Sequence, residues 1–247
     1  MHTYLNTFIE KNFQKYLDQL KKNVYIDDTF DNWTSPAVSI TNINHSIIND
    51  IKNLSENIFH EFNPNTGANL KEWYSNYRAD SWNELVLLNN DETNEIYDFI
   101  NKKMICSKKN NKVKENTVLL QKCLDLLDIK DSSCIKTLRI ATVDPGGFIH
   151  PHKDKLSNVR CLWMPLHDFS WCLKFFPFGW LMHEFGNAYL VNNGKYVHGV
   201  LNTSRERRYV LNIDFFENLS KDKLLKWHEK SPTNWKDIFT NNLTTQK

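Results

Sequence analysis

Residues 138–154 read LRIATVDPGGFIHPHKD and place a strand, a turn and a group of possible metal ligands in immediate succession. The first part is rich in β-branched and apolar residues and ends at Asp144-Pro145-Gly146-Gly147, a combination that favours a turn. The chain then continues through Phe148 into an H-x-D triplet. The sequence therefore predicts two consecutive strands joined by a turn, with the triplet at the end of the second.

Several further short strands follow this pair, and turn residues separate most of them. The predicted strands cover residues 159–166, 171–176, 180–183, 187–192, 196–201 and 207–216. Closely spaced antiparallel strands in this number favour a barrel or jelly roll of the cupin type, which is a double-stranded β-helix. We therefore expect residues 136–217 to form the β-helix core.

The first half of the chain has mainly helical periodicity. Apolar residues recur at helical spacing within residues 5–20, 47–58 and 118–127, whereas residues 82–88 have the pattern of a strand that ends at Asn89-Asn90. We predict an α+β fold in which the N-terminal helices pack outside the barrel. Residues 1–247 would form a single domain, with 1–135 as mainly helical support and 218–247 as a C-terminal helical extension.

Composition is typical of a protein with a sizeable core and no strong surface field. Hydrophobic residues make up 40% of the chain, enough for one large domain. The 31 basic and 29 acidic residues nearly cancel to a net charge of +2, so no global field would attract nucleic acid or a membrane surface. We expect neither as a partner.

Cysteine usage and the absence of targeting patterns predict a cytoplasmic location. The 5 cysteines are odd in number and contain no C-x-x-C pair, which disfavours a disulfide framework and a structural zinc site. The first residues lack the pattern of a signal peptide, and no apolar run approaches the roughly 20 residues needed to span a bilayer. We therefore predict a cytoplasmic protein whose cysteines are reduced thiols.

Two histidines and an aspartate form the candidate metal site. His152 and Asp154 are two positions apart, and such residues project to the same side of a strand. His198 would come from another strand of the barrel. Two imidazoles and one carboxylate are the ligand set that holds Fe(II) on one face and leaves the other face open. His150 has the same parity as His152 and is an alternative ligand, but we place it beside the metal or the substrate.

Two blocks of the sequence resemble the aspartyl/asparaginyl β-hydroxylase-like family of Fe(II)/2-oxoglutarate oxygenases. In residues 138–154 the resemblance lies in the strand, the Pro-Gly turn and the H-x-D triplet. In residues 186–214 it lies in His198 and the later R-x-x-L-x-x-D strand. The resemblance covers roughly residues 136–216. It implies Fe(II) and O2, 2-oxoglutarate as cosubstrate, and hydroxylation of an unactivated C–H in an amino acid, a similar small molecule or a peptide side chain.

The same resemblance assigns Arg208 to the distal carboxylate of 2-oxoglutarate. A planar guanidinium is suited to a bidentate grip on a carboxylate in a partly desolvated pocket. Arg160 aligns with a second arginine that faces the cosubstrate in the family. Arg205 and Arg207 are alternatives to Arg208, because a slip of one residue turns the neighbour inward. Since Asp154 is retained, the resemblance disfavours halogenation, for which related enzymes replace this carboxylate with a small residue.

Two other classes of function remain open on the residues alone. The first is another cupin-type metalloenzyme, because His198 and Asn202 have the H-x-x-x-N spacing of a second cupin motif. That interpretation needs a glutamate soon after the paired histidines, where the chain has Leu156 and Ser157. The second is a metal-free binding protein that keeps only the fold, and such a protein would be expected to have lost metal ligands.

The aromatic stretch 167–180 either fills the core or lines a pocket.

Overall fold

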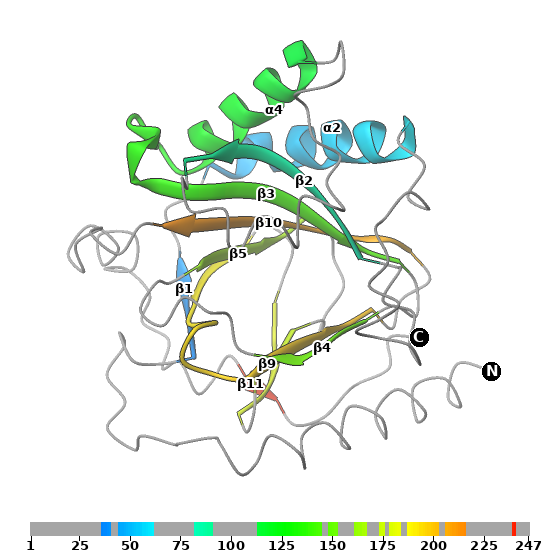
Figure 1. Ribbon diagram of the computed structural model, residues 1–247, viewed down its shortest axis with the longest axis vertical. Helices are drawn as coiled ribbons and strands as arrows, with labels where there is room; N and C mark the ends of the chain where they lie inside the picture. Colours follow the sequence, from blue (N-terminus) through cyan, green and yellow to red (C-terminus); the bar gives the residue numbers. More distant parts are fainter. Residues whose placement is uncertain are drawn as a thin grey trace.

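Two antiparallel β-sheets face each other, and two α-helices cover the outer surface of one of them (Figure 1). The computed structural model describes residues 36–40, 44–61, 82–90, 113–144, 148–152, 161–166, 173–175, 178–183, 187–202, 206–215 and 239–240. The predicted α+β class is confirmed as a mixture of helices and antiparallel sheet. The amphipathic helix expected within residues 5–20 lies outside the described residues.

From β3 onward, consecutive strands lie in opposite sheets, except for β6 and β7, which pair within one sheet. The larger sheet has the order β1 (Ala37–Ile40), β8 (Ala188–Val191), β5 (Cys161–Pro165), β10 (Arg208–Phe215), β3 (Ile135–Val143) and β2 (Trp82–Asn89). The smaller sheet has the order β11 (Phe239–Thr240), β7 (Gly179–Leu181), β6 (Leu173–Phe175), β9 (His198–Leu201) and β4 (Phe148–His152). Thus β3 leads into β4 on the opposite sheet, and β9 leads into β10 in the same way.

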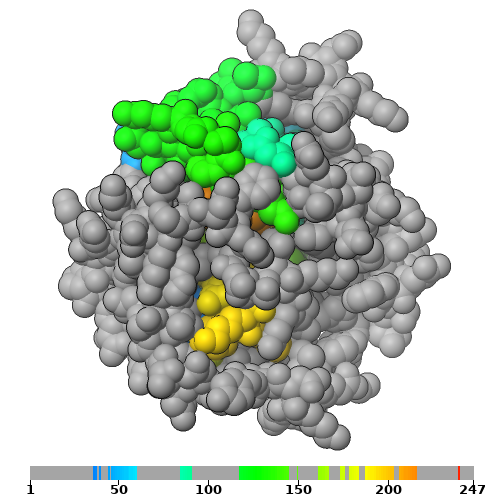
Figure 2. All heavy atoms as spheres, turned by 60° about the vertical axis from the view of Figure 1, so that its left-hand side comes forward, coloured from blue at the N-terminus to red at the C-terminus, as the bar shows by residue number. Residues whose placement is uncertain are grey.

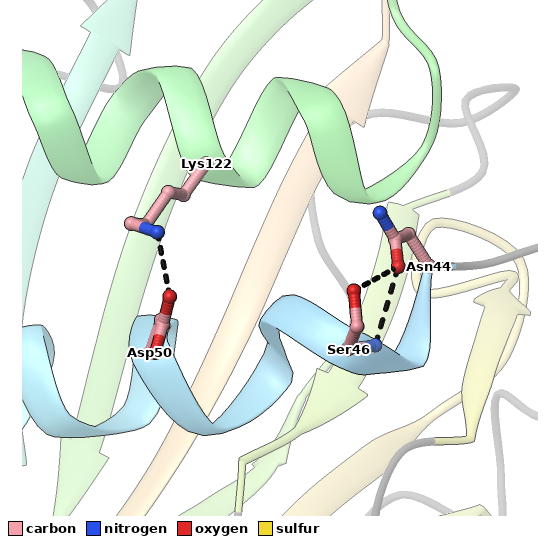
Figure 3. A network of polar contacts seen from close by, with 4 residues as sticks. All are labelled: Asn44, Ser46, Asp50 and Lys122. Carbon is pink, nitrogen blue, oxygen red and sulfur yellow. Dashed lines mark hydrogen bonds and ion pairs between the residues drawn. The ribbon is translucent and has the colours of Figure 1, made fainter.

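Two helices pack against the outer face of the larger sheet. A short 3-10 turn, η2 (His45–Ile47), leads into α2 (Ile48–Glu61), and α4 (Val113–Leu126) lies beside α2. Asn44 caps the first turn, since its Oδ1 accepts hydrogen bonds from Ser46 N and Ser46 Oγ at 3.2 and 2.6 Å (Figure 3). Lys122 Nζ of α4 lies 2.7 Å from Asp50 Oδ2 of α2. This pair is half-exposed, so it contributes at most about 1 kcal/mol, and apolar packing holds the helices.

The alternating pattern of β10 separates two apolar layers. Tyr209, Leu211 and Ile213 belong to the layer between the larger sheet and the helices. Val210 points the other way, into a layer that also contains Val143 of β3 together with residues of β6 and β9. Because successive side chains of a strand point to opposite faces, one strand serves both layers. We call the side of each sheet that borders this second layer the inner face.

Most elements predicted from periodicity are confirmed. The strands expected at 82–88, 136–143, 159–166 and 207–216 correspond to β2, β3, β5 and β10, and the helices expected at 47–58 and 118–127 correspond to α2 and α4. The short strand β1 was not predicted. The helical extension expected at 218–247 is wrong at its one described segment, because residues 239–240 form β11, where Phe239 packs its ring against Phe175 at 6.0 Å.

Three described cysteines, Cys123, Cys134 and Cys161, are free thiols, as predicted, while Cys106 and Cys172 lie outside the described residues. Burial raises the pKa of the Cys123 thiol and so favours its protonated form.

The outer surface of one side of the molecule is seen in Figure 2, where α4 and the segment after it form the green surface and the β8–β9 region a separate yellow one. Neither α2 nor α4, nor any other helix in the described part of the chain, has the length and apolar character needed to cross a lipid bilayer.

Candidate metal and cosubstrate site

The pairing of β4 with β9 places His152 directly opposite His198. The register runs from Phe148 opposite Leu201 and Ile149 opposite Val200 to His152 opposite His198, with a shift between Ile149 and His152. Over this shift β4 advances by three residues and β9 by two, so β4 contains one extra residue. The extra residue falls beside Pro151, which has no N–H to give to the ladder. Without this bulge Pro151 would stand opposite His198.

His198 lies on the inner face of the smaller sheet. Its exposed fraction is 5%, its register partner on β6 is Phe175, and the two rings have centroids 5.7 Å apart. Phe175 and Val200, two residues beyond His198, both belong to the apolar layer between the sheets. His198 therefore projects into the space between the two sheets.

The contacts of the His198 ring fit a metal ligand. Its Nδ1 lies 3.2 Å from the carbonyl oxygen of Tyr196, which can only accept a hydrogen bond. This pairing favours a proton on Nδ1, and in the neutral ring Nε2 is then the nitrogen that can bind a metal ion. A backbone carbonyl is a common partner for the non-ligating nitrogen of a metal-bound histidine.

The other predicted ligands are described only in part. For His152 and His150 the structure gives the backbone, and Asp154 lies outside the described residues. Among the side chains that are described, no three His, Cys, Asp and Glu residues gather closely enough to hold a metal ion. The sequence argument that His150 shares the face of His152 relied on simple alternation along the strand. The bulge interrupts this alternation between Ile149 and His152, so equal parity does not establish a shared face.

Arg208 lies on the inner face of the larger sheet. It is 3% exposed, and it shares the face of Val210, two residues further along β10. Its guanidinium carbon lies 5.2 Å from the centroid of the Trp163 ring, within the range of a cation–π contact. The buried guanidinium therefore faces the same space between the sheets as His198.

The neighbouring Arg207 points to the other side and has a different contact. Its Nε lies 2.6 Å from Asp144 Oδ1, at the end of β3. Burial alone would lower the pKa of Arg207, but the hydrogen bond and charge of Asp144 outweigh it and raise the pKa. Arg205 and Arg160 lie outside the described residues.

His183 and Tyr189 pack against Trp163, the aromatic contact of Arg208, and none of these three residues was singled out from the sequence. The His183 ring meets the Trp163 ring nearly at right angles, at 5.2 Å and 81°, and is itself 5% exposed. Tyr189 stands opposite Trp163 in the register of β8 and β5, with ring centroids 6.1 Å apart. The sequence placed Trp163 within the predicted strand 159–166. Alternation along a strand does not say which of its two sets of side chains faces inward.

A separate polar cluster occupies the inner face near the other end of β10. Arg139 Nε lies 3.4 Å from Glu84 Oε1, and its terminal nitrogen lies 3.2 Å from Asp214 Oδ2. Thr137 Oγ1 donates to the same Asp214 oxygen at 2.6 Å. Two carboxylates thus offset the charge of Arg139, which ties β2, β3 and β10 together.

Asn202 links the end of β9 to the end of β3 and to the residues just before β10. Its side chain is fully buried, and its Nδ2 donates to the carbonyl oxygens of Val143 and Glu206, both at 2.8 Å. The first bond ties Asn202 to the end of β3, and the second ties it to Glu206, two residues before Arg208. The amide that completes the cupin-like H-x-x-x-N spacing therefore binds backbone groups.

We expect Asn202→Ala to destabilise the fold by about 2 kcal/mol, because two buried carbonyl oxygens lose their donors. The change should appear as a lower midpoint in urea unfolding. Asn90→Ala is the matched control, since the exposed Asn90 also donates to two carbonyl oxygens, those of Ser132 and Ile135, at 3.1 and 3.0 Å. Equal losses in the two variants would contradict a bracing role for Asn202 that depends on its burial.

Comparison with known proteins gives one family match. A sequence profile described as Aspartyl/Asparaginyl beta-hydroxylase matches residues 44–218, more than two thirds of the 247 residues. A search of curated proteins finds no match.

Comparison with solved structures gives oxygenases at low identity. A prolyl-4-hydroxylase from Pseudomonas putida is 11% identical over 74% of this chain and 93% of its own, with a TM-score of 0.45. A prolyl hydroxylase from Trichoplax adhaerens, in complex with a hypoxia inducible factor peptide, is 11% identical over 94% and 97%, with a TM-score of 0.43. An oxidoreductase of the 2OG-Fe(II) oxygenase family from Burkholderia pseudomallei is 13% identical over 42% of this chain, with a TM-score of 0.32; the match spans 59% of that protein.

Proposed function

Because the chain belongs to the aspartyl/asparaginyl β-hydroxylase family, we propose that it is an Fe(II)- and 2-oxoglutarate-dependent dioxygenase that hydroxylates an unactivated C–H. The observation that carries this proposal is the position of His152 opposite His198, with the buried Arg208 on the facing sheet. Its substrate would be an amino acid, an amino-acid-like small molecule or a peptide side chain. We place it in the cytoplasm, in keeping with its free thiols.

The proposed metal ligands are His152, Asp154 and His198. Directly opposed positions of antiparallel strands share a face, with Cβ atoms typically about 5 Å apart, which suits two imidazoles on one ion. Asp154 follows the end of β4 by two residues and would supply the carboxylate. The hydrogen bond between His198 Nδ1 and Tyr196 would hold the ring in its ligating orientation.

Arg208, with Arg160 as a second residue, is proposed to bind 2-oxoglutarate. The pairs Phe148–Leu201 and Val143–Arg208 lie at the ends of β4 and β3 that follow each other in the sequence, and His198 is three residues away from Leu201 along β9. Three residues of strand span about 10 Å, so a small dicarboxylate bound at the metal can extend towards the guanidinium. A guanidinium buried beside apolar residues is well suited to a carboxylate, because the two charges offset each other's desolvation.

The order of strands supports a double-stranded β-helix as the framework of the proposed site. Strands β3, β5, β8 and β10 belong to the larger sheet, and β4, β6, β7 and β9 to the smaller one. We propose that residues 136–217 form this core within a single domain of residues 1–247. In that arrangement the histidines and Arg208 come from facing sheets and share the enclosed layer.

When bound, Fe(II) with 2-oxoglutarate and O2 supplies the oxidising power for the reaction. One oxygen atom enters the substrate as a hydroxyl group and the other enters succinate, while 2-oxoglutarate loses CO2. The chain's own residues bind and orient the reactants. Apolar side chains such as Phe175 and Val200 beside His198 exclude water, which protects the site from side reactions.

The test is to incubate the purified protein with Fe(II), 2-oxoglutarate, ascorbate and O2, and to screen amino acids, short peptides and small-molecule extracts for stimulated succinate formation. We expect succinate and hydroxylated product in equal amounts, and no product when Fe(II), 2-oxoglutarate or O2 is omitted. A metal-loaded protein that binds no 2-oxoglutarate in an equilibrium measurement would refute the proposal independently of the substrate.

A further inference from the structure

Trp163 has an unusual position among the buried aromatic residues, because it connects the proposed cosubstrate arginine to both sheets. It lies on β5, 4% exposed, with the guanidinium carbon of Arg208 5.2 Å from its ring centroid. Its ring also meets His183, which follows β7 of the smaller sheet, and Tyr189 of β8. One side chain thus joins residues of β5, β8 and β10 to a segment of the opposite sheet.

Described arginines have neighbours of two kinds. Arg139 and Arg207 have carboxylate oxygens of the protein within 3.4 and 2.6 Å. The guanidinium carbon of Arg208 lies 5.2 Å from the centroid of the Trp163 ring. An indole offers no strong hydrogen-bond acceptor, so it can position the guanidinium while a ligand carboxylate binds the N–H groups.

Trp163 is itself held in place from two sides. Tyr189 stands opposite it in the register, and the Tyr189 hydroxyl donates to the carbonyl oxygen of Met182 at 3.1 Å. That bond ties β8 to the segment that carries His183, whose ring packs at 5.2 Å and 81° to the indole. A buried indole with neighbours on several sides has few rotamers available, so it offers a rigid surface to the guanidinium.

We propose that Trp163 is the positioning residue of the cosubstrate site: it orients Arg208 towards the distal carboxylate and, with His183 behind it, sets the length of the 2-oxo dicarboxylic acid that is accepted. This inference rests on the proposed function, because it assumes that Arg208 binds that carboxylate. A shorter side chain at position 163 lets the guanidinium move, which weakens binding of the five-carbon acid and reduces discrimination against a six-carbon acid.

The experiment measures equilibrium binding of 2-oxoglutarate and 2-oxoadipate to the Mn(II)-loaded protein without O2, by calorimetry. In Trp163→Leu we expect the Kd for 2-oxoglutarate to rise roughly tenfold, which corresponds to about 1.4 kcal/mol, with a smaller preference for it over 2-oxoadipate. Trp163→Phe keeps an aromatic face, so its Kd should rise only about threefold. Mn(II) affinity should stay at the wild-type value in both.

Trp180→Leu is the matched control. Trp180 is also buried, and Lys174 Nζ lies 5.2 Å from its ring centroid, but the two stand opposite each other on the outer face of the smaller sheet. This variant should lose stability and keep the wild-type Kd and selectivity. If Trp180→Leu weakens 2-oxoglutarate binding as much as Trp163→Leu does, the effect is general destabilisation and the proposal is overturned.

The remaining outcomes separate this inference from the proposed function. If wild-type protein binds Mn(II) but no 2-oxoglutarate, the proposed function fails and this inference fails with it. If wild type binds 2-oxoglutarate and Trp163→Leu binds it equally well with unchanged selectivity, only the positioning role is refuted. Should Trp163→Leu not fold, Trp163→Phe decides, because unchanged affinity and selectivity in that variant also refute the role.

Discussion

Replacing His198 by alanine is expected to remove iron binding and, with it, succinate formation. Loss of a residue that only supports a metal ligand commonly lowers metal affinity 10- to 100-fold, so loss of a direct ligand should lower it by more than about 100-fold. The His198 ring is buried on the inner face and cannot be replaced by another described side chain of the same strand, whose next inward residue is Val200. Metal content after gel filtration, together with succinate formation, measures the effect.

A second buried histidine provides the control for metal content. His183 has the same 5% exposure as His198 and also packs against an aromatic ring, that of Trp163. His183→Leu should therefore keep the bound iron, although the proposed cosubstrate site predicts weaker 2-oxoglutarate binding. Wild-type iron content in His198→Ala would reject His198 as a ligand, and loss of iron in both variants would point to unfolding, which a thermal melt detects.

Replacing Arg208 by glutamine is expected to raise the KM for 2-oxoglutarate by roughly 100-fold, or about 2.7 kcal/mol, because a desolvated carboxylate loses its charged, bidentate partner. Iron binding should be retained, since the side chain contacts Trp163 on the larger sheet and the proposed ligand His198 belongs to the smaller one. Arg208→Lys keeps the charge and loses the planar fork, so its KM should lie between those of wild type and Arg208→Gln. Titration of succinate formation against 2-oxoglutarate gives each value.

The adjacent arginine gives a closely matched control. Arg207→Ala removes the same type of side chain one residue away, together with the ion pair to Asp144. Because this pair is only partly buried, its loss should lower the free energy of unfolding by about 1 kcal/mol or less and leave the KM for 2-oxoglutarate unchanged. A large rise in KM for Arg207→Ala with none for Arg208→Gln would transfer the cosubstrate role to Arg207.

The sequence alone predicted much of the secondary structure, because the helical and strand periodicities of apolar residues are local properties of the chain. Apolar residues at helical spacing marked α2 and α4, and β-rich runs bounded by turn residues marked strands such as β3 and β10. β3 ends at Val143 and β4 begins at Phe148, so the two strands stop on either side of the stretch predicted as a turn. The two-residue strand β11 was missed in favour of a helix, since so short a segment has no period and depends on Phe239 packing against a distant strand.

The sequence by itself also determined which residue types were available for a metal and a carboxylate, through the H-x-D triplet, the later histidine and a run of arginines. Only the tertiary structure decided which of them meet. A bulge at Pro151 puts His152 opposite His198, alternation along β10 turns Arg208 inward and Arg207 towards Asp144, and Trp163 lies beneath Arg208. The physical reason is that strand register is a long-range property: a single extra residue reverses which side chains face inward, and no local pattern records the partner strand.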